Sequence, residues 1–416
     1  MPKRNVLEHI TTFNRGRDPE LLGFKYCALR SSPLAFFRGT NHLFYQDWRP
    51  DRLLDRAPAA WICGDLHVEN FGSFKGDNRL TYFDINDFDE AVLAPCTWEL
   101  ARLLVSVLVA AKALQVHHRQ ALALCHHCLD AYQVALRKGK AHWIERATAQ
   151  GMVKALLSGL KARSEQKFVA GRTTQRGGHR VVKVDGKRAL PASEEQVVKV
   201  RRLLERFVEQ PPPFGPLKVV DVARRIAGTG SLGIERYVIL AKRKGAPNAG
   251  YLLDLKHEPG SALAPYVRLP QPRWASEAER VVSIQQRVQA ESPAFLSAVT
   301  LGSKSFVLRE LLPSDDRLQL ESGNGKLRRL EQVMTAMGQL VAWGNLRSGG
   351  RQGSAITDEW IDFGKRGDWG RPLLEYAQAY GHQVLADWQE FSAAYDSGLL
   401  PGASPVKQQR ATASSR

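Results

Sequence analysis

The sequence predicts an α+β fold in which a small antiparallel sheet and a mainly helical part occupy different stretches of the chain. Runs of β-branched and aromatic residues at 217–227, 233–245 and 251–258 are joined by short connections, which is typical of an antiparallel meander. A further strand is predicted at 303–311. Stretches with the apolar spacing of helices lie before, within and after this segment. They are 33–48, 97–114, 118–139, 276–291, 327–345 and 371–391.

Composition limits the class of protein. With 44% apolar and 24% charged residues, a chain of 416 residues can form two or three core-bearing regions. Its net charge of +17 favours anionic partners such as nucleotides, nucleic acid or acidic lipid head groups. Five cysteines without framework spacing indicate a reduced, cytoplasmic protein. No secretory signal is expected, and the longest apolar run, from Leu103, is too short to span a membrane.

Shifts in composition predict the domain boundaries. Residues 1–208 form the first part of a helical lobe, and the proline-rich stretch 209–216 opens a sheet lobe that extends over 209–320. Residues 321–398 supply the closing helices of the helical lobe. The polar, basic tail at 399–416 is expected to be disordered.

A basic segment precedes the sheet lobe. Residues 161–188 contain nine basic and two acidic residues with several glycines, and we interpret them as flexible or hairpin-like. The segment can bind nucleic acid or an acidic substrate, or be a solvated loop. Because Phe168 is its only aromatic residue, it lacks the stacking surface of a single-strand binder, and nucleic acid is not the favoured partner.

The strongest chemical signal is a pair of motifs, GDLHVEN and YFDIND, near the N-terminus. Asp65 is followed five residues later by Asn70, and the second motif supplies Asp84. A loop with Asp and Asn, followed by a hairpin return with another Asp, can place three oxygen side chains around one small volume. This arrangement suits Mg²⁺ bound together with substrate phosphates, as phosphoryl transfer requires. The alternative is a polar turn whose side chains only cap backbone groups.

More acids follow directly in the sequence. Asp87, Asp89 and Glu90 are either additional metal or substrate ligands, with Asp87 the first candidate, or a solvated acidic turn. Glu99 is either a functional anchor or an ordinary first-turn acid favoured by the helix dipole.

The segments HVENFGSF and FDINDFDE, with SPLAFFRG upstream and WELARLLVS downstream, resemble the bacterial family catalogued as domain of unknown function 2252. That family is similar to the protein-kinase-like superfamily, particularly its aminoglycoside and choline kinase branch. The resemblance implies ATP and Mg²⁺ as cofactors, Asp65 as the catalytic aspartate, and Asn70 and Asp84 as metal ligands. Cys63 stands where those kinases often have His, and Glu99 matches the position that anchors their catalytic loop.

A glycine-rich loop is predicted between the first two strands of the meander, where GTGSLG supplies four candidate phosphate-binding residues. They are Gly228, Gly230, Ser231 and Gly233. A glycine loop that joins two strands lets backbone N–H groups approach phosphates, whereas a dinucleotide site needs a helix after the loop. The alternative is a glycine-rich hairpin turn. Lys256, on the third strand, corresponds to the kinase lysine that contacts phosphates, or is a solvent-facing strand-edge lysine.

Two further contacts complete the nucleotide site that the resemblance implies. Glu279, or Glu277, is expected to form the ion pair that orients Lys256, although either can be an ordinary surface acid. Residues Glu310 to Leu312 are expected to offer backbone contacts to the adenine ring.

These parts occur in an unusual order. Only 64 residues precede Asp65, which is too few for the nucleotide lobe that comes first in an ordinary kinase. We therefore interpret the chain as a protein-kinase-like, two-lobed fold in circularly permuted order, since permutation is tolerated when the termini of a parent fold lie close together.

Other motifs receive a plainer interpretation. The tripeptide DFG at 362–364 lacks a catalytic loop upstream, so we interpret it as a chance match in a loop before the last helix. The CHHC segment at 125–128 is interpreted as a helix face with buried cysteines, with a zinc site as the alternative.

The predicted function is an Mg·ATP-dependent phosphotransferase acting on an unidentified acceptor, with nucleotidyl transfer as a variant. One alternative is a metal-dependent phosphoesterase, because GDLH contains the Asp-x-His of that class, although the further ligand segment of that class is missing. The other is a catalytically inactive kinase-like protein that binds polyanions or nucleic acid.

Overall fold

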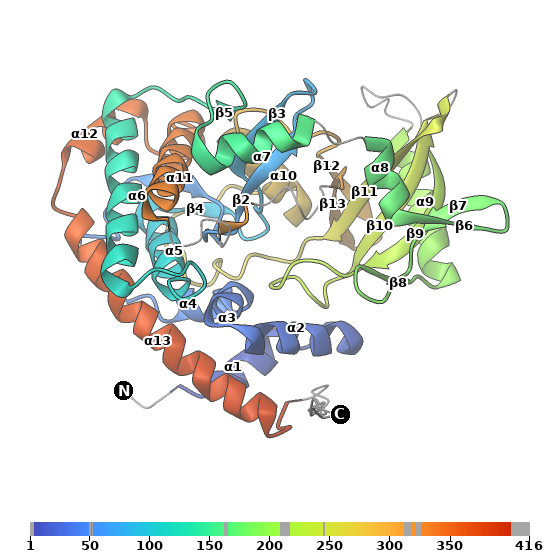
Figure 1. Ribbon diagram of the computed structural model, residues 1–416, viewed down its shortest axis with the longest axis horizontal. Helices are drawn as coiled ribbons and strands as arrows, with labels where there is room; N and C mark the ends of the chain where they lie inside the picture. Colours follow the sequence, from blue (N-terminus) through green and yellow to red (C-terminus); the bar gives the residue numbers. More distant parts are fainter. Residues whose placement is uncertain are drawn as a thin grey trace, which may run out of the picture.

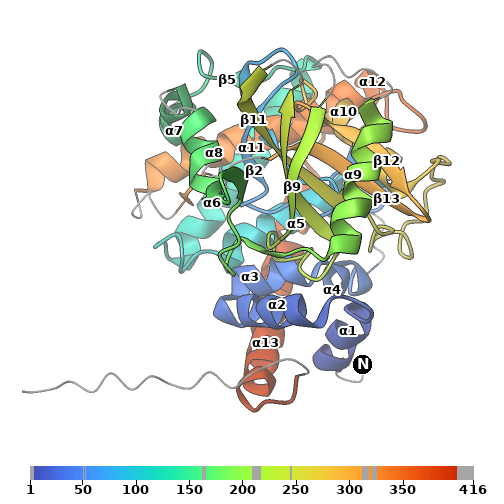
Figure 2. The same cartoon turned by 90° about the vertical axis from the view of Figure 1, so that its right-hand side faces the viewer.

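The structure is a computed structural model, and it describes residues 4–49, 51, 53–161, 165–208, 217–243, 246–311, 318–320 and 326–400. Within these residues, helices from both ends of the chain pack together on one side, and a six-stranded antiparallel sheet lies on the other (Figures 1 and 2). The predicted α+β class is confirmed. In the described part of the chain, no helix combines the length and the apolar character needed to cross a membrane.

Short helices begin the chain, and local capping explains where they start. They are α1 (Val6–Phe13), α2 (Pro19–Ser31), α3 (Pro33–Gly39) and α4 (Asn41–Gln46). The side chains of Asp18 and Ser32 accept backbone N–H groups in the first turns of α2 and α3, each of which has proline at its first position. The single helix expected at 33–48 is divided at Thr40, where the backbone leaves the helical conformation.

Two small sheets lie in the middle of the helical part. Their strands are β1 (Ala59–Ile62), β2 (Phe71–Lys75), β3 (Thr81–Ile85), β4 (Val92–Pro95) and β5 (Ile144–Glu145). β1 pairs with β4, and β3 pairs with β2 and β5, all antiparallel. Each of the two strand-like runs expected at the carboxylate-rich motifs is therefore interrupted by a loop, at 63–70 and at 86–91. The two loops are in contact, because the backbone N–H of Asn86 donates to the carbonyl of Asn70.

Longer helices complete the helical part. They are α5 (Cys96–Val109), α6 (His118–Lys138), α7 (Gly151–Lys161), α11 (Leu327–Ser348), α12 (Thr357–Lys365) and α13 (Gly370–Asp396). α5 is apolar nearly all round and is buried along almost its whole length. The DFG tripeptide lies within α12 rather than in a loop, and its exposed Asp362 pairs with Lys365 one turn later.

The large sheet has the strand order β12-β13-β11-β10-β9-β8. Its strands are β8 (Ala189–Pro191), β9 (Leu217–Arg225), β10 (Arg236–Arg243), β11 (Ala246–His257), β12 (Ser297–Leu301) and β13 (Lys304–Glu310). The expected meander is confirmed as β9, β10 and β11, and the expected strand at 303–311 as β13. α10 (Glu277–Val288) connects β11 to β12.

Alternation along the strands gives the large sheet two different faces. On one face, Tyr237 and Ile239 belong to a core shared with α9 (Glu194–Val208). On the other, Val238 and Leu240 share a core with residues 165–182. That segment comprises α8 (Glu165–Arg172) and the hairpin of β6 (Thr173–Arg176) and β7 (His179–Val182).

Two predictions concern the approach to this sheet. The flexible or hairpin-like interpretation of 161–188 holds for residues 173–182, where β6 pairs with β7, whereas residues 165–172 form α8. The proline-rich boundary at 209–216 lies outside the described residues, and the helix before it, α9, packs on β9 and β12.

Candidate functional site

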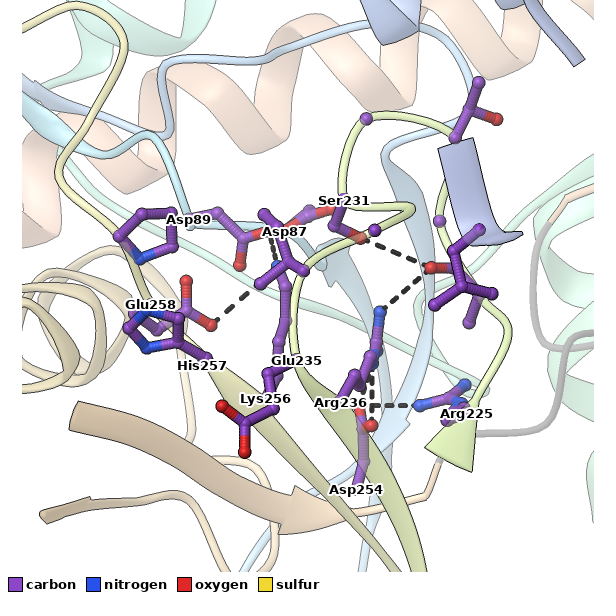
Figure 3. A pocket seen from close by; sticks show the side chains of 18 of the residues that line it. Asp87, Asp89, Arg225, Ser231, Glu235, Arg236, Asp254, Lys256, His257 and Glu258 are labelled. Carbon is purple, nitrogen blue, oxygen red and sulfur yellow. Dashed lines mark hydrogen bonds and ion pairs between the residues drawn. The ribbon is translucent and has the colours of Figure 1, made fainter. Parts of the chain in front are cut away.

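A cleft of about 950 Å³ lies between the helical part and the large sheet (Figure 3). Loops 63–70 and 86–91 contribute to one wall, and the glycine-rich loop with β10 and β11 to the other. The cleft brings together most of the predicted site residues, although 191 positions separate Asp65 from Lys256. Those that line it are Asp65, Asn70, Asp87, Gly228, Gly230, Ser231, Gly233 and Lys256.

Loop 63–70 is held by one face of α5. The Glu99 carboxylate accepts the backbone N–H of Cys63 at 2.8 Å, and the Ser106 hydroxyl accepts that of Val68 at 3.0 Å. Arg102 lies between these two positions on the same helix face and reaches the loop at Asp65. Glu99 thus occupies the anchoring position that the sequence motif implied, and its burial raises its pKa to about 7.

Gly64 allows the two loops to approach closely. Its φ is +79°, and a Cβ atom at this position would lie 2.2 Å from the carbonyl oxygen of Glu90. Only glycine combines this backbone conformation with this contact. The hydroxyl of Tyr45 also donates to the Gly64 carbonyl at 2.8 Å, which fixes the turn from a third side.

Asp65 carries the most distinctive carboxylate of the cleft. Nε of Arg102 donates to its Oδ1 at 2.8 Å, and the guanidinium itself is fully buried and stacks over the ring of Phe37. Burial raises the pKa of Asp65 to about 7, although Arg102 opposes this shift, and the neighbouring acids Asp87 and Glu90 add to it. A carboxyl group with such a pKa exchanges its proton near neutral pH.

The buried side chain of Asn70 uses its nitrogen in hydrogen bonds, whereas its oxygen makes none within the described residues. Its Nδ2 donates to the backbone carbonyls of Asp65 at 3.1 Å and Asp87 at 3.3 Å, so the side chain joins the two loops. Its Oδ1 is buried and has no hydrogen-bond partner among the described residues. A buried acceptor without a partner is costly, so this position is a candidate for contact with a bound ion, ligand or water.

The two predicted metal-binding aspartates lie in different surroundings. Asp87 lines the cleft. Asp84 does not belong to the described cleft lining; it is the penultimate residue of β3, and its buried carboxylate lies 3.2 Å from the guanidinium of Arg347 on α11. The expectation that Asp84 meets Lys256 across the cleft is therefore corrected: Asp87, in the loop after β3, lines the cleft together with Lys256.

Lys256 is buried and paired with acids other than the expected one. Its Nζ forms an ion pair with Asp89 and lies 3.8 Å from Glu258 Oε1 (Figure 3). Burial raises the pKa of Glu258 to about 7, although the charge of Lys256 opposes the shift.

The expected ion pair from α10 is not formed among the described residues. The carboxylate of Glu279 accepts the backbone N–H of Ala275 at the start of α10, and Glu277 pairs with Arg280. α10 approaches the site through Arg280 instead, whose guanidinium donates to the carbonyl of Asp89 at 2.8 Å. Both glutamates lie in the first turn of α10, where acids stabilise the helix end, which explains why they remain there.

The glycine-rich loop, residues 227–233, joins β9 to β10 as expected, and its carbonyl groups are held by the N-terminal helices. Arg17 donates to the carbonyls of Gly230 at 2.7 Å and Leu232 at 3.1 Å. The buried amine of Lys25 also donates to Gly230 O at 2.9 Å, and the backbone N–H of Asp18 donates to Gly233 O. By contrast, no N–H group from 228 to 233 has an acceptor in the part of the chain that the structure describes. A run of free N–H groups beside a cleft suits an anion.

A cluster of charges lies on the same sheet face, between the glycine-rich loop and Lys256. The carboxylate of Asp254, 1% exposed, is paired with Arg225 and Arg236 (Figure 3). Arg309 lies 3.5 Å from the same carboxylate. Burial alone would raise the pKa of Asp254, but these guanidinium groups lower it well below its ordinary range. We call these three arginines with Asp254 the arginine cluster.

Of the predicted adenine contacts, Glu310 and Leu311 are not among the residues that line the cleft. The backbone N–H of Glu310 donates to Ala294, and that of Leu311 to Leu252, so neither is available to a ligand. Glu310 lines a separate small cavity of about 10 Å³. Leu312 lies outside the described residues.

The CHHC segment is part of the helical core. Cys125 and Cys128 are fully buried in α6, whereas His126 and His127 between them are exposed. The described residues contain no group of three or more His, Cys, Asp or Glu side chains arranged to hold a metal ion. The interpretation as a buried cysteine face is confirmed.

Three residues that shape the site were missed from the sequence. Arg102 had a signal, because it follows Glu99 by three positions and so shares its helix face. Arg17, in the turn between α1 and α2, and Lys25, on α2, had none, since arginine and lysine side chains are ordinarily exposed.

Comparison with known proteins adds one relationship. The family described as "Uncharacterized protein conserved in bacteria (DUF2252)" matches residues 17–394, from the residue before the Asp18 cap of α2 to the last turn of α13. No curated protein and no solved structure matches the chain. Because the match includes both loops, the glycine-rich loop and the whole large sheet, the chain belongs to the DUF2252 family of uncharacterised bacterial proteins.

Proposed function

We propose that the protein binds ATP with Mg²⁺ in this cleft and transfers a phosphoryl group, or in the variant reaction the nucleotidyl group, to an acceptor. One observation carries the proposal: Asp65 and Asn70 share a cleft with Lys256 and the glycine-rich loop. Unrelated short motifs that match by chance have no reason to converge on one cavity.

The order of elements in the large sheet supports a nucleotide-binding lobe. The glycine-rich loop follows β9, Lys256 lies in β11, and α10 comes next. Protein kinases also have a glycine-rich loop, a lysine on the third strand and a helix after it. Because loops 63–70 and 86–91 precede this lobe in the chain, we infer a circularly permuted kinase-like fold.

Asn70 and Asp87 are suited to hold Mg²⁺. Asn70 offers a buried oxygen without a partner among the described residues, and Asp87 lines the same cleft. One carboxylate and one amide oxygen are a sufficient protein contribution, because Mg²⁺ usually keeps several waters and binds substrate phosphates. When bound, the ion neutralises charge on the phosphate oxygens.

The chain's own side chains then have distinct tasks. Lys256 and the N–H groups of the glycine-rich loop contact the phosphates. Asp65, fixed by Arg102, orients the acceptor hydroxyl and takes its proton as the acceptor oxygen bonds to the γ-phosphorus. The bond from that phosphorus to the β–γ bridging oxygen breaks, and ADP leaves. In the variant reaction the acceptor bonds to the α-phosphorus and pyrophosphate leaves.

Thermal-shift titration with ATP, with and without Mg²⁺, tests the proposal. Ligand at 100 times its Kd adds about 2.7 kcal/mol of apparent stability, so the wild type should melt at a higher temperature with Mg·ATP. Asp87→Asn and Lys256→Met should lose most of this shift. Asp362→Asn and Lys365→Met, which change an exposed pair in α12, are the matched controls and should keep it.

The opposite results would remove the proposal. They are the absence of a shift in the wild type, or an equal shift in Lys256→Met. If the shift is present, incubation of the wild type with γ-labelled and α-labelled ATP and a cell extract separates phosphoryl from nucleotidyl transfer.

A further inference from the structure

The arginine cluster occupies part of the sheet wall of the cleft, close to Lys256. Asp254 is two residues before Lys256 on β11, so both side chains point to the cleft. Arg309 on β13 is directly opposite Asp254 in the register, and Arg225 ends β9 just before the glycine-rich loop. A base-binding site is ordinarily apolar, but this wall consists of charged groups.

The cluster has more positive than negative charge. Asp254 is one carboxylate among three guanidinium groups, and Arg236 alone occupies both of its oxygens, at 2.8 and 2.5 Å. Arg225 and Arg309 reach only Oδ2, at 2.6 and 3.5 Å. Burial lowers the pKa of Arg225 to about 9, and Asp254 only partly offsets this. A second anion beside Arg225 and Arg309 would therefore stabilise the cluster.

The two outer arginines are partly exposed and have donors that Asp254 does not use, one of which, Nη1 of Arg309, donates to the carbonyl of Asn86 at 3.3 Å. Their side chains are 17% and 19% exposed, and both line the cleft. Guanidinium groups bind phosphate and carboxylate oxygens through paired hydrogen bonds. The free N–H groups of the glycine-rich loop border the same space, which extends the anion-binding surface toward Lys256.

We propose that Arg225 and Arg309 form a second anion site that binds the terminal phosphate of an oligophosphate chain. This inference deepens the proposed function and rests on it for the identity of the ligand as a nucleotide. Affinity in the cleft then depends on the phosphate chain rather than on the base.

Calorimetric titration of the full chain with Mg²⁺ and three probes tests this proposal. The probes are ATP, inorganic tripolyphosphate and adenosine. In the wild type, tripolyphosphate should bind within about tenfold of ATP, and adenosine should bind at least about 100-fold more weakly. Arg225→Gln and Arg309→Gln should each weaken ATP and tripolyphosphate by about tenfold or more, as expected for loss of a hydrogen bond from a charged donor.

A control variant at an arginine outside the cleft shows whether any loss of affinity is specific to Arg225 and Arg309. Arg176→Gln removes an exposed arginine of the β6–β7 hairpin outside the cleft lining, and it should leave both affinities unchanged. Using both Arg225→Gln and Arg309→Gln keeps the test valid if one of them fails to fold, which thermal melting without ligand would reveal. Arg236 is left intact, because its loss would remove the main partner of a buried carboxylate.

The outcomes separate this inference from the proposed function. If ATP binds but neither arginine variant weakens it, or if adenosine binds as tightly as ATP, the anion site is overturned while nucleotide binding stands. If tripolyphosphate binds through Arg225 and Arg309 but ATP does not bind, the anion site stands and the proposed function falls.

Discussion

Asp84 and Asp87 are three residues apart, yet their carboxylates serve different parts of the molecule. β3 ends at Ile85, so Asp84 remains in the strand and pairs with Arg347, whereas Asp87 belongs to the loop that borders the cleft. In a continuing strand these two side chains would also point to opposite faces. The end of the strand is not visible in the amino-acid pattern, and for this reason the sequence favoured Asp84 over Asp87 as the main metal ligand.

This contrast gives a prediction at the level of single residues. Asp87→Asn should abolish the Mg²⁺-dependent part of the ATP-induced thermal shift and lower the stability of the free protein by less than Asp84→Asn does. Asp84→Asn should have the reverse profile and lower the free energy of unfolding by about 3 kcal/mol, because Arg347 loses its buried partner. Urea unfolding and ATP titration of both variants measure the two effects. A stability loss confined to Asp87→Asn would contradict this assignment.

Glu99 gives a second prediction, on the pH dependence of stability. Burial raises its pKa from 4.5 to about 7, although the backbone N–H of Cys63 opposes the shift. Because the folded protein then holds the proton more tightly than the unfolded chain, Glu99 stabilises the fold fully below pH 4.5, and this contribution is lost as the pH rises to 7. Relative to Glu99→Gln, the wild type should lose up to about 3 kcal/mol over this interval.

Denaturant unfolding of both proteins between about pH 4.5 and 8 measures this difference. Glutamine keeps an acceptor for the Cys63 N–H, so the variant removes the titration and keeps the hydrogen bond. A constant difference across the whole range would mean that the folded state does not raise the pKa of Glu99.

At the scale of elements, the best-predicted parts are those with long, regular patterns. α6 (His118–Lys138) and the strands β9 to β11 lie within a few residues of their predicted bounds. β8 and β12 were not predicted, because strands of three and five residues are too short for their alternation to be distinctive. The helix at 33–48 was predicted without its break at Thr40 since the apolar spacing continues across it.

Site residues were likewise predictable where a local sequence pattern marks them, and not where only tertiary contacts do. Asp65, Asn70 and Lys256 were found because each lies in a local motif whose spacing is visible in the sequence. Arg17, by contrast, acts on a loop 213 positions away in the chain, and no local pattern encodes that contact. Residues whose role depends on tertiary packing alone require the structure.

The close contact of the two loops leads to a prediction for Gly64. Gly64→Ala places a Cβ atom against the Glu90 carbonyl in a left-handed backbone conformation, so both strain and overpacking oppose it. We expect a loss of about 3 kcal/mol in the free energy of unfolding. Gly186→Ala is the matched control, because its φ of +69° is similar but nothing lies within 4 Å of the added carbon. It should cost only about 1 kcal/mol.

Urea unfolding of the two variants separates the contact from the backbone strain. Equal losses in both would show that the loops can separate without cost. In that case the close approach of Gly64 to Glu90 would contribute nothing to holding loop 63–70.

On the scale of the whole molecule, the positions of the two described chain ends determine whether the order of the elements along the chain can be changed. The chain ends described by the structure lie beside α13: Arg4 pairs with Asp387 of that helix, and Leu400 follows it in the same core. Asp387 and Leu400 are separated by roughly 20 Å at helical rise. A flexible linker of about 15 residues can therefore join the two ends.

This geometry predicts that a re-ordered chain will fold. We expect a variant opened within 209–216, with Leu400 joined to Arg4 by such a linker, to keep the wild-type melting behaviour within a few degrees and the same response to Mg·ATP. It would place strands β9 to β13 of the large sheet first and β8 with α9 last in the chain. A matched variant opened after Leu104, inside the buried α5, should not fold. Failure of both would mean that the native chain order is required for folding.

The hydrogen bonds from Arg17 and Lys25 to the glycine-rich loop have a consequence for motion. They fasten the sheet to the N-terminal helices across the cleft mouth, so the two sides cannot separate while these bonds persist. For a ligand to enter or leave beneath the loop, either the hydrogen bonds from Arg17 and Lys25 must break, or α2 must move together with the sheet. For the proposed phosphoryl transfer, we expect this opening step, rather than bond formation at phosphorus, to limit the rate.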